Sequence, residues 1–289
     1  MNKTLLGLVK TGETVLEAYG IENPRLESEI LLSALLKGSR LDLYLRKDDR
    51  VDFNFASKFE ETLNRRGTHE PVQYITGQEF FLNRPFSVGP GVLIPRPETE
   101  GLVQAALNKL EEGPFLDLGT GSGCIAISIL LEHQKYLEGY AIDISPAALS
   151  FARTNSKSFG LTSRLHIFEG NLFQPLPQKL RGSFEVIVSN PPYLDLEADE
   201  IDYSVRKFEP MLAINGGAGG LDFYRSILEE AGFWLVPGGY LILELGINQL
   251  DTVSSLMKNH SNWNRVDIAR DEQGIARVLT LAHKGSSLG

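Results

Sequence analysis

From residue 97 onward, short apolar runs alternate with longer segments of helical periodicity. The apolar runs are Pro114–Leu118, Tyr140–Ile142, Leu165–Phe168, Phe184–Val188 and Tyr240–Leu243. The helical segments are Glu98–Leu110, Ile125–Lys135, Pro146–Phe159, Phe223–Leu235 and Leu250–Asn259. Such alternation predicts an α/β fold with a doubly wound, mostly parallel sheet.

Two more strands are expected near the end of the chain. Arg265–Ala269 and Ala276–Leu281 are apolar or alternating runs, separated by the polar turn at residues 270–274. A short polar connection of this kind favours an antiparallel hairpin. The hairpin would bring the sheet to seven strands, and the terminal residues 284–289 (KGSSLG) are expected to be disordered.

The first quarter of the chain has a different pattern. Residues 3–66 read as helices, with Asn23 and Pro24 as a plausible cap and first residue of a helix through Leu36, and with another helix at Phe55–Arg66. Aromatic and β-branched residues then surround turn signals in residues 79–95, which suggests a hairpin. We therefore expect a helical domain at 1–75, a linker with a hairpin at 76–96 and a sheet domain at 97–289.

Composition narrows the class of protein. No apolar run approaches the roughly 20 residues of a membrane span, and the N-terminus has helical spacing instead of a signal-peptide core, so we expect a cytoplasmic protein. The net charge of −9 argues, weakly, against a bare nucleic acid substrate. The single Cys124 is expected to be a small buried residue, and the five histidines lack metal-ligand spacing, so no metal is implied.

A glycine-rich loop follows the first strand of the sheet domain. Asp117 precedes Gly119, Gly121 and Gly123, and a dinucleotide-binding loop would need a further glycine where this chain has Cys124. The second strand ends at Asp143, whose carboxylate can accept hydrogen bonds from both hydroxyls of a ribose. The pattern resembles class I S-adenosylmethionine-dependent methyltransferases; the alternative is an ordinary strand-to-helix turn.

The fourth strand ends in Asn190-Pro191-Pro192-Tyr193. By itself this tetrapeptide could be a stiff turn, but it is similar to the (N/D)-P-P-(Y/F) motif of methyltransferases that act on planar nitrogens. The resemblance implies that the Asn190 side-chain oxygen and the Pro191 carbonyl accept the two N–H bonds of the substrate nitrogen. Tyr193 would offer a flat face for stacking, and catalysis would come mainly from orientation.

Further stretches resemble the release-factor glutamine methyltransferase family (the HemK/PrmC family) over most of the chain. They are Arg65-Arg66, residues 70–77, Glu79-Phe80, residues 92–100, residues 208–210, residues 219–225 and residues 238–246. The run from Ile94 to Glu100, IPRPETE, is the most specific. The resemblance implies methylation of the side-chain nitrogen (N5) of the glutamine in the Gly-Gly-Gln loop of peptide-chain release factors, with the helical domain gripping that partner.

The resemblance also implies roles for individual residues, in a protein expected to be monomeric and not to bind nucleic acid directly. The catalytic residues would be Asn190, Pro191 and Tyr193, and the substrate-binding residues Asn190, Pro191, Pro192 and Tyr193. The S-adenosylmethionine-binding residues would be Gly119, Thr120, Gly121, Ser122, Gly123, Asp143, Asn171, Leu172 and Asn190.

Asn171 and Leu172 depart from the acid and aromatic residue that the family commonly has there, so an adenine contact would use a neutral amide and an aliphatic face. Two other classes remain open: a DNA or RNA amino-group methyltransferase and a noncatalytic binding module. The first usually has a basic groove or a target-recognition domain, and neither is evident. The second would predict damage at Gly121, Asp143 or Asn190, and all three residues are intact.

Overall fold

The computed structural model describes residues 3–258, 260 and 262–284. Its contacts divide the chain into two compact units. The first contains the residues up to Gln78 together with Asp202–Phe208, and the second contains Glu79–Ile201 and the residues from Glu209 onward. None of the described helices is both long enough and apolar enough to cross a membrane.

The first unit is helical. Its elements are α1 (Leu5–Ala18), α2 (Pro24–Leu36), α3 (Arg40–Leu45), α4 (Phe53–Gly67), α5 (Val72–Thr76) and α9 (Tyr203–Phe208). Side chains of Thr4, Ser39 and Asp52 cap α1, α3 and α4. The expected start of α2 is confirmed, because Asn23 is the N-cap residue and Pro24, with φ already fixed by its ring, is the first residue of the helix. The Asn23 side chain makes no capping hydrogen bond.

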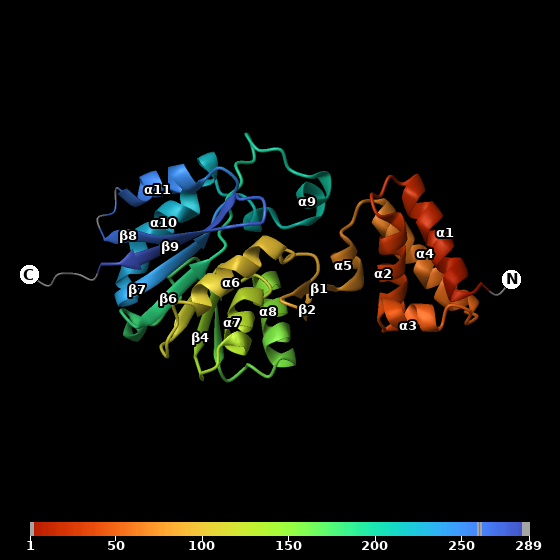
Figure 1. Cartoon of the computed structure of the whole chain (residues 1–289), viewed down its shortest axis with the longest axis horizontal. Coiled ribbons are helices and arrows are strands. Elements are labelled where there is room, and N and C mark those ends of the chain that lie inside the picture. The colour runs from red at the N-terminus through yellow and green to blue at the C-terminus, as the bar shows by residue number, and fades with distance from the viewer. Residues whose placement is uncertain (1–2, 259, 261, 285–289) are drawn as a thin grey trace, which may run out of the picture. The chain divides into compact units, whose positions relative to one another are not determined.

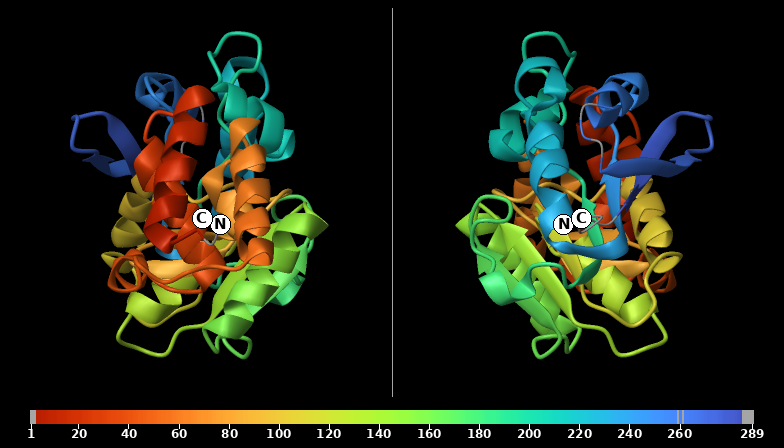
Figure 2. Two further views of the ribbon diagram at one scale, coloured as in Figure 1. Left: turned by 90° about the vertical axis from the view of Figure 1, so that its right-hand side faces the viewer. Right: turned by 90° about the vertical axis from the view of Figure 1, so that its left-hand side faces the viewer.

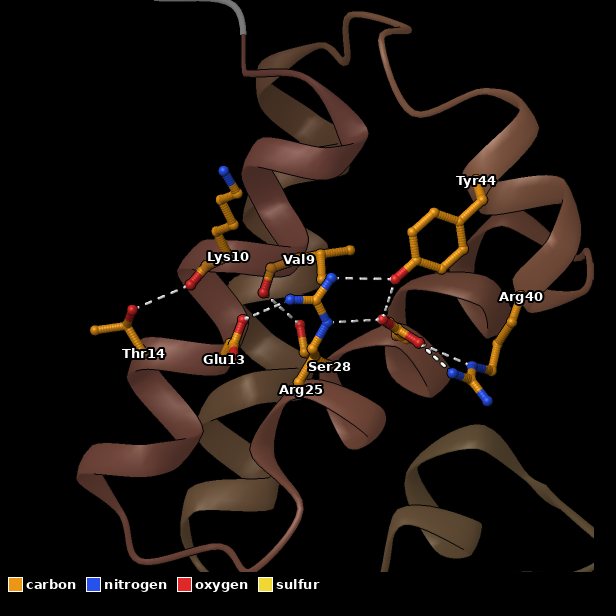
Figure 3. A network of polar contacts seen from close by, with 9 residues as sticks. Val9, Lys10, Glu13, Thr14, Arg25, Ser28, Arg40 and Tyr44 are labelled. Carbon is orange, nitrogen blue, oxygen red and sulfur yellow. Dashed lines mark hydrogen bonds and ion pairs between the residues drawn. The ribbon is translucent and has the colours of Figure 1, made fainter.

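A buried carboxylate organises one end of this helical unit. Glu29 of α2 is 2% exposed and accepts hydrogen bonds from Arg40 Nε at 2.9 Å and from the Tyr44 hydroxyl at 2.5 Å. Arg40 Nη2 adds a hydrogen bond at 2.5 Å, and Arg25 Nε adds another at 3.3 Å. Figure 3 shows the side chains of Arg25, Arg40 and Tyr44 pointing toward one another. Burial alone would raise the pKa of Glu29, but the hydrogen bonds from Tyr44 and Arg40 outweigh it and lower the pKa.

The second unit contains the seven-stranded sheet that the alternation predicts. Its strands are β3 (Phe115–Leu118), β4 (Gly139–Asp143), β5 (Leu165–Glu169), β6 (Phe184–Ser189), β7 (Leu235–Glu244), β8 (Trp263–Arg270) and β9 (Ala276–His283). They lie in the order β5-β4-β3-β6-β7-β9-β8. The first five are parallel, whereas β9 is antiparallel to both β7 and β8. The fold prediction, terminal hairpin included, is confirmed.

Helices cover both faces of this sheet (Figure 1). One face carries α6 (Glu100–Leu107), α7 (Cys124–Glu132) and α8 (Pro146–Ser158), and the other carries α10 (Asp222–Glu230) and α11 (Leu250–Lys258). Each face has its own apolar core, with Ile127 and Ala106 in one and Ile227 and Val253 in the other. Helix α8 and the β8–β9 hairpin lie at opposite ends of the sheet (Figure 2).

Several expected boundaries need correction. The helix expected at Glu98–Leu110 begins with a 3-10 turn, η1 (Pro97–Thr99), and α6 ends at Leu107. The helix expected to reach Leu235 stops at Glu230 and is followed by η5 (Ala231–Phe233), and Leu235 starts β7. Asn259 and residues 285–289 lie outside the described residues, so the expectations for them stay untested.

A small hairpin precedes the sheet. Strands β1 (Gln78–Phe81) and β2 (Arg84–Ser87) form a separate two-stranded sheet. Leu82 and Asn83 between them both have positive φ, 47° and 59°. Two such residues make the tight turn whose twist suits paired strands. The aromatic residues and turn signals of this stretch did predict a hairpin.

Candidate active site

Strands β3 and β6 are adjacent at the point where the strand order reverses. The chain runs from β3 outward through β4 to β5 and then returns to place β6 on the other side of β3. Leu118 and Ser189 pair at the carboxyl ends of the two strands, and Ser189 Oγ donates to the Leu118 carbonyl at 2.8 Å. In open α/β sheets this is where ligands bind.

The glycine-rich loop leaves β3 at this point. Gly119, Gly121 and Gly123 all have positive φ, at 72°, 56° and 82°, a conformation that L side chains rarely adopt. Asp117 is fully buried beneath the loop and accepts a hydrogen bond from Thr120 Oγ1 at 2.6 Å. Burial raises the pKa of Asp117 to about 7. The hydrogen bond therefore ties Thr120 of the loop to Asp117 in β3.

Asp143 at the end of β4 is tied to the same loop. Its Oδ2 accepts from the Gly121 backbone N–H and its Oδ1 from the Ser145 N–H, both at 2.8 Å. Burial raises its pKa, and these backbone hydrogen bonds oppose the rise. Because the two carboxylate oxygens together have about four acceptor positions, Asp143 keeps acceptor capacity for a ligand hydroxyl.

A cavity lies over these strand ends, and most of the predicted cofactor residues line it. They are Gly119, Thr120, Gly121, Ser122, Asp143, Asn171, Leu172 and Asn190. Gly123 is outside the lining and instead precedes α7 as its cap. Leu172 has φ 46°, which is uncommon for a residue with a branched side chain and marks a backbone constraint at the cavity wall.

The tetrapeptide at the end of β6 is divided between the cavity and the core. Asn190, Pro191 and Pro192 line the cavity, but Tyr193 does not. The Tyr193 ring is half-buried against one of the apolar cores, and its carbonyl accepts a hydrogen bond from Gln249 Nε2 at 2.9 Å. Burial raises the pKa of the Tyr193 phenol to about 12, so it stays protonated.

Several lining residues were missed by sequence reasoning. Arg96 lines the cavity and forms an ion pair with Glu209, which is 2% exposed in its side chain and also accepts from the Ile94 N–H at 3.1 Å. This pair holds the IPRPETE run in place. Ile144 also lines the cavity and is 52% exposed. Its position, as an apolar residue directly after the acid that ends β4, is the feature of the sequence that could have predicted it.

Cys124 also lies at the cavity, where α7 begins. It is 7% exposed, so the expectation of a small buried residue is confirmed. Burial raises the pKa of its thiol to about 12, and a thiol that does not ionise is a poor nucleophile.

Comparison with known proteins agrees with this arrangement. Residues 8–77 match the PrmC N-terminal domain, and residues 98–209 match the methyltransferase small domain. A release factor glutamine methyltransferase of Nitratidesulfovibrio vulgaris is 39% identical over 280 residues, which cover 96% of this chain and 94% of the relative. The chain belongs to the release factor glutamine methyltransferase family.

Other relatives are consistent with this membership. The release factor glutamine methyltransferase of Geobacter sulfurreducens is 40% identical over 264 residues, 90% of each chain. A methyltransferase structure from Pyrococcus furiosus, 18% identical, superposes with a TM-score of 0.53 over 79% of this chain and 99% of that one. At that identity the likeness shows the fold alone. The match to the methyltransferase small domain, at residues 98–209, contains the glycine loop, Asp143 and Asn190.

Proposed function

We propose that this enzyme transfers a methyl group from S-adenosylmethionine to the side-chain amide nitrogen (N5) of the glutamine in the Gly-Gly-Gln loop of release factors. One observation carries the proposal: the glycine loop, Asp143 and Asn190, which are far apart in the sequence, line a single cavity at the switch point of the sheet. Family membership adds the substrate class. We also propose that the enzyme is cytoplasmic and monomeric and that its helical domain binds the release factor.

The residues at the cavity suit S-adenosylmethionine. Asp143 keeps acceptor capacity for ribose hydroxyls, and Gly119 and Gly121 bring the loop backbone close without side chains in the way. Ile144 and Leu172 add apolar surface to the wall near Asn171, where the adenine would lie. The aliphatic Leu172 replaces the aromatic residue common in the family, so packing there would rest on methyl groups.

When bound, S-adenosylmethionine would supply an electrophilic methyl group on a cationic sulfur. The chain's own contribution is to hold the nucleophile, because an amide nitrogen whose lone pair is delocalised reacts poorly. We assign Asn190 Oδ1 and the Pro191 carbonyl as acceptors for the two N–H bonds of the glutamine amide. Alignment of this kind is worth roughly 7–11 kcal/mol in favourable cases, and the excess proton can leave to water after the N–C bond forms.

Tyr193 has a narrower role in this proposal than sequence reasoning gave it. Its ring is packed against a core and its carbonyl is held by Gln249, so it fixes the path of the two prolines that precede it. Stacking of the ring on the substrate amide stays a prediction. A variant Tyr193→Phe, which keeps the ring and removes only the hydroxyl, should therefore retain most of the turnover.

The decisive experiment uses methyl-labelled S-adenosylmethionine with the purified full-length protein. The substrates are a release factor, its Gln→Ala variant at the Gly-Gly-Gln loop, total tRNA, rRNA and duplex DNA. Label that enters only the intact release factor supports the proposal and identifies the target residue. Label in nucleic acid would retain the methyltransferase chemistry and overturn the substrate, and label in none of them would overturn the proposal.

A further inference from the structure

A buried carboxylate lies next to Asn190 and has no part in the mechanism above. Glu244 ends β7, which runs parallel to β6, and the pairing of Ser189 with Leu243 places Asn190 and Glu244 side by side just beyond it. Residues paired across parallel strands direct their side chains to the same face. Glu244 is 2% exposed, and its Oε2 makes no hydrogen bond with any described residue.

Thr99 completes a cluster of three polar side chains. It lies in the turn η1, is 2% exposed, and accepts a hydrogen bond at its Oγ1 from Asn190 Nδ2 at 3.2 Å. Burial raises the pKa of Glu244 to about 7, and hydrogen bonds from the Thr99 and Asn190 side chains oppose that rise. Thr99 lines the cavity together with Asn190, whereas Glu244 lies outside the lining.

When Glu244 is ionised, the cluster has only one satisfactory arrangement of hydrogen bonds. A hydroxyl can either donate or accept, so Thr99 alone would tolerate an Asn190 amide turned either way. A carboxylate only accepts, and it repels the amide oxygen. If Thr99 donates its single proton to Glu244, its oxygen must accept from Asn190, and the nitrogen end of the amide faces the cluster.

We propose that Glu244 is a positioning residue that acts through Thr99 to fix the Asn190 amide with Nδ2 toward the protein and Oδ1 toward the acceptor amide. The proposal rests on the proposed function. The reaction needs Oδ1 as an acceptor for a substrate N–H. If the Asn190 amide were turned the other way, its own two N–H hydrogens would face the N–H hydrogens of the substrate amide. Glu244 thereby excludes the nonproductive orientation without contacting the substrate.

The test uses steady-state kinetics with saturating S-adenosylmethionine and a release factor, at a pH above about 7, where Glu244 is ionised. Glu244→Gln can pair with either end of the Asn190 amide and so removes the selection; Thr99→Val removes the hydroxyl at nearly constant volume. Each should lower kcat about tenfold or more while the two KM values stay within about threefold. The matched control is Thr280→Val, the same substitution at a threonine that is 3% exposed in β9; it should leave kcat unchanged.

A second pair of variants tests the contact itself. Asn190→Asp places a carboxylate beside Glu244, and the two negative charges should disfavour each other. Replacing Glu244 by Gln in that background should therefore raise kcat, although the same replacement lowers it in the wild type. Independent sites would instead show additive losses, and additive losses would overturn the proposal.

An observation that does not depend on activity completes the test. The side-chain amide protons of Asn190, assigned by their absence in Asn190→Asp, should shift in the NMR spectrum of Glu244→Gln and of Thr99→Val but not of Thr280→Val. Unchanged kcat and unchanged amide shifts in the first two variants would overturn the positioning role. If the wild-type protein fails to methylate the release factor, the proposed function is wrong. The NMR shifts of the Asn190 side-chain amide protons still test whether Glu244 and Thr99 orient that amide.

Discussion

The Gly121 backbone N–H donates to Asp143 Oδ2 at 2.8 Å, which joins the glycine loop after β3 to the acid that ends β4. The carboxylate thus has two tasks, since it supports the loop from one side and keeps lone pairs for a ligand on the other. The two elements that resemble cofactor-binding motifs separately in the sequence are one hydrogen-bonded unit in the structure.

Replacing Asp143 by Ala should chiefly weaken the binding of S-adenosylmethionine. The variant loses the carboxylate that would accept from the ribose hydroxyls and that supports the loop. Because hydrogen bonds to a charged group contribute about 1.5–3 kcal/mol, we expect the Kd to rise by about tenfold to a hundredfold. Isothermal titration calorimetry measures this directly. An unchanged Kd would show that the ribose assignment is wrong.

Asn190→Ala should reduce turnover and leave binding largely intact. The side chain is proposed to hold the substrate nitrogen, and loss of one preorganised polar group typically costs about 10²-fold or more in kcat. The measurement is kcat for the release factor at saturating S-adenosylmethionine, with the Kd and the thermal midpoint as controls. A variant with near-normal turnover would remove Asn190 from the mechanism.

Gly220→Ala should disturb the segment that follows β6. A Cβ at Gly220 would meet the Tyr193 carbonyl oxygen at 2.0 Å, and φ there is +67°. Gly274 is a matched control, because its φ is +79° and a Cβ meets nothing within 4 Å. Both alanine variants should lose about 1 kcal/mol from backbone strain, but only Gly220→Ala should also lower kcat. Equal kcat values in the two variants would show that the close approach of Gly220 to the Tyr193 carbonyl does not affect the active site.

The Glu29 network should stabilise the helical unit. Glu29→Gln keeps the shape but loses the charge that Arg40 and Tyr44 hydrogen-bond, and should lower the free energy of unfolding by about 1–3 kcal/mol. Because the folded-state pKa of Glu29 is lowered, this contribution is present above pH 4.5, its ordinary pKa, and is lost as the pH falls through the folded-state value. Urea unfolding of both proteins between pH 3 and 7 measures it, and Tyr44→Phe isolates the hydroxyl.

Glu244 should have the opposite effect of pH. Its pKa is raised by burial from 4.5 to about 7, so the folded state holds a proton that the unfolded state releases. The free energy of unfolding of the wild type, relative to Glu244→Gln, should fall as the pH rises from about 4.5 to 7 and stay level above, by about 1–3 kcal/mol in total. Asp117, another buried carboxyl whose pKa is raised to about 7, is common to both proteins. A difference that is constant with pH would contradict the raised pKa.

The sequence by itself determined the type and order of the elements. Helical and strand periodicity are local properties, and the seven strands were found at nearly their observed positions because each is an apolar run between turn signals. The motif residues Gly119, Asp143 and Asn190 were recognisable for the same reason, since each lies at the carboxyl end of a strand. The carboxyl ends of parallel strands share one edge of a sheet.

Only the tertiary structure decided how side chains from distant segments meet. Thr99 and Glu244 lie in stretches that resemble the family, but neither stretch shows that the two residues meet, because β6, β7 and η1 bring them to Asn190 only in the folded chain. Nor does the sequence show that the Tyr193 ring packs against an apolar core while its carbonyl accepts a hydrogen bond from Gln249. Stacking of the ring on the substrate amide stays a prediction. Burial and hydrogen bonding between distant segments depend on packing, and a one-dimensional pattern does not contain them.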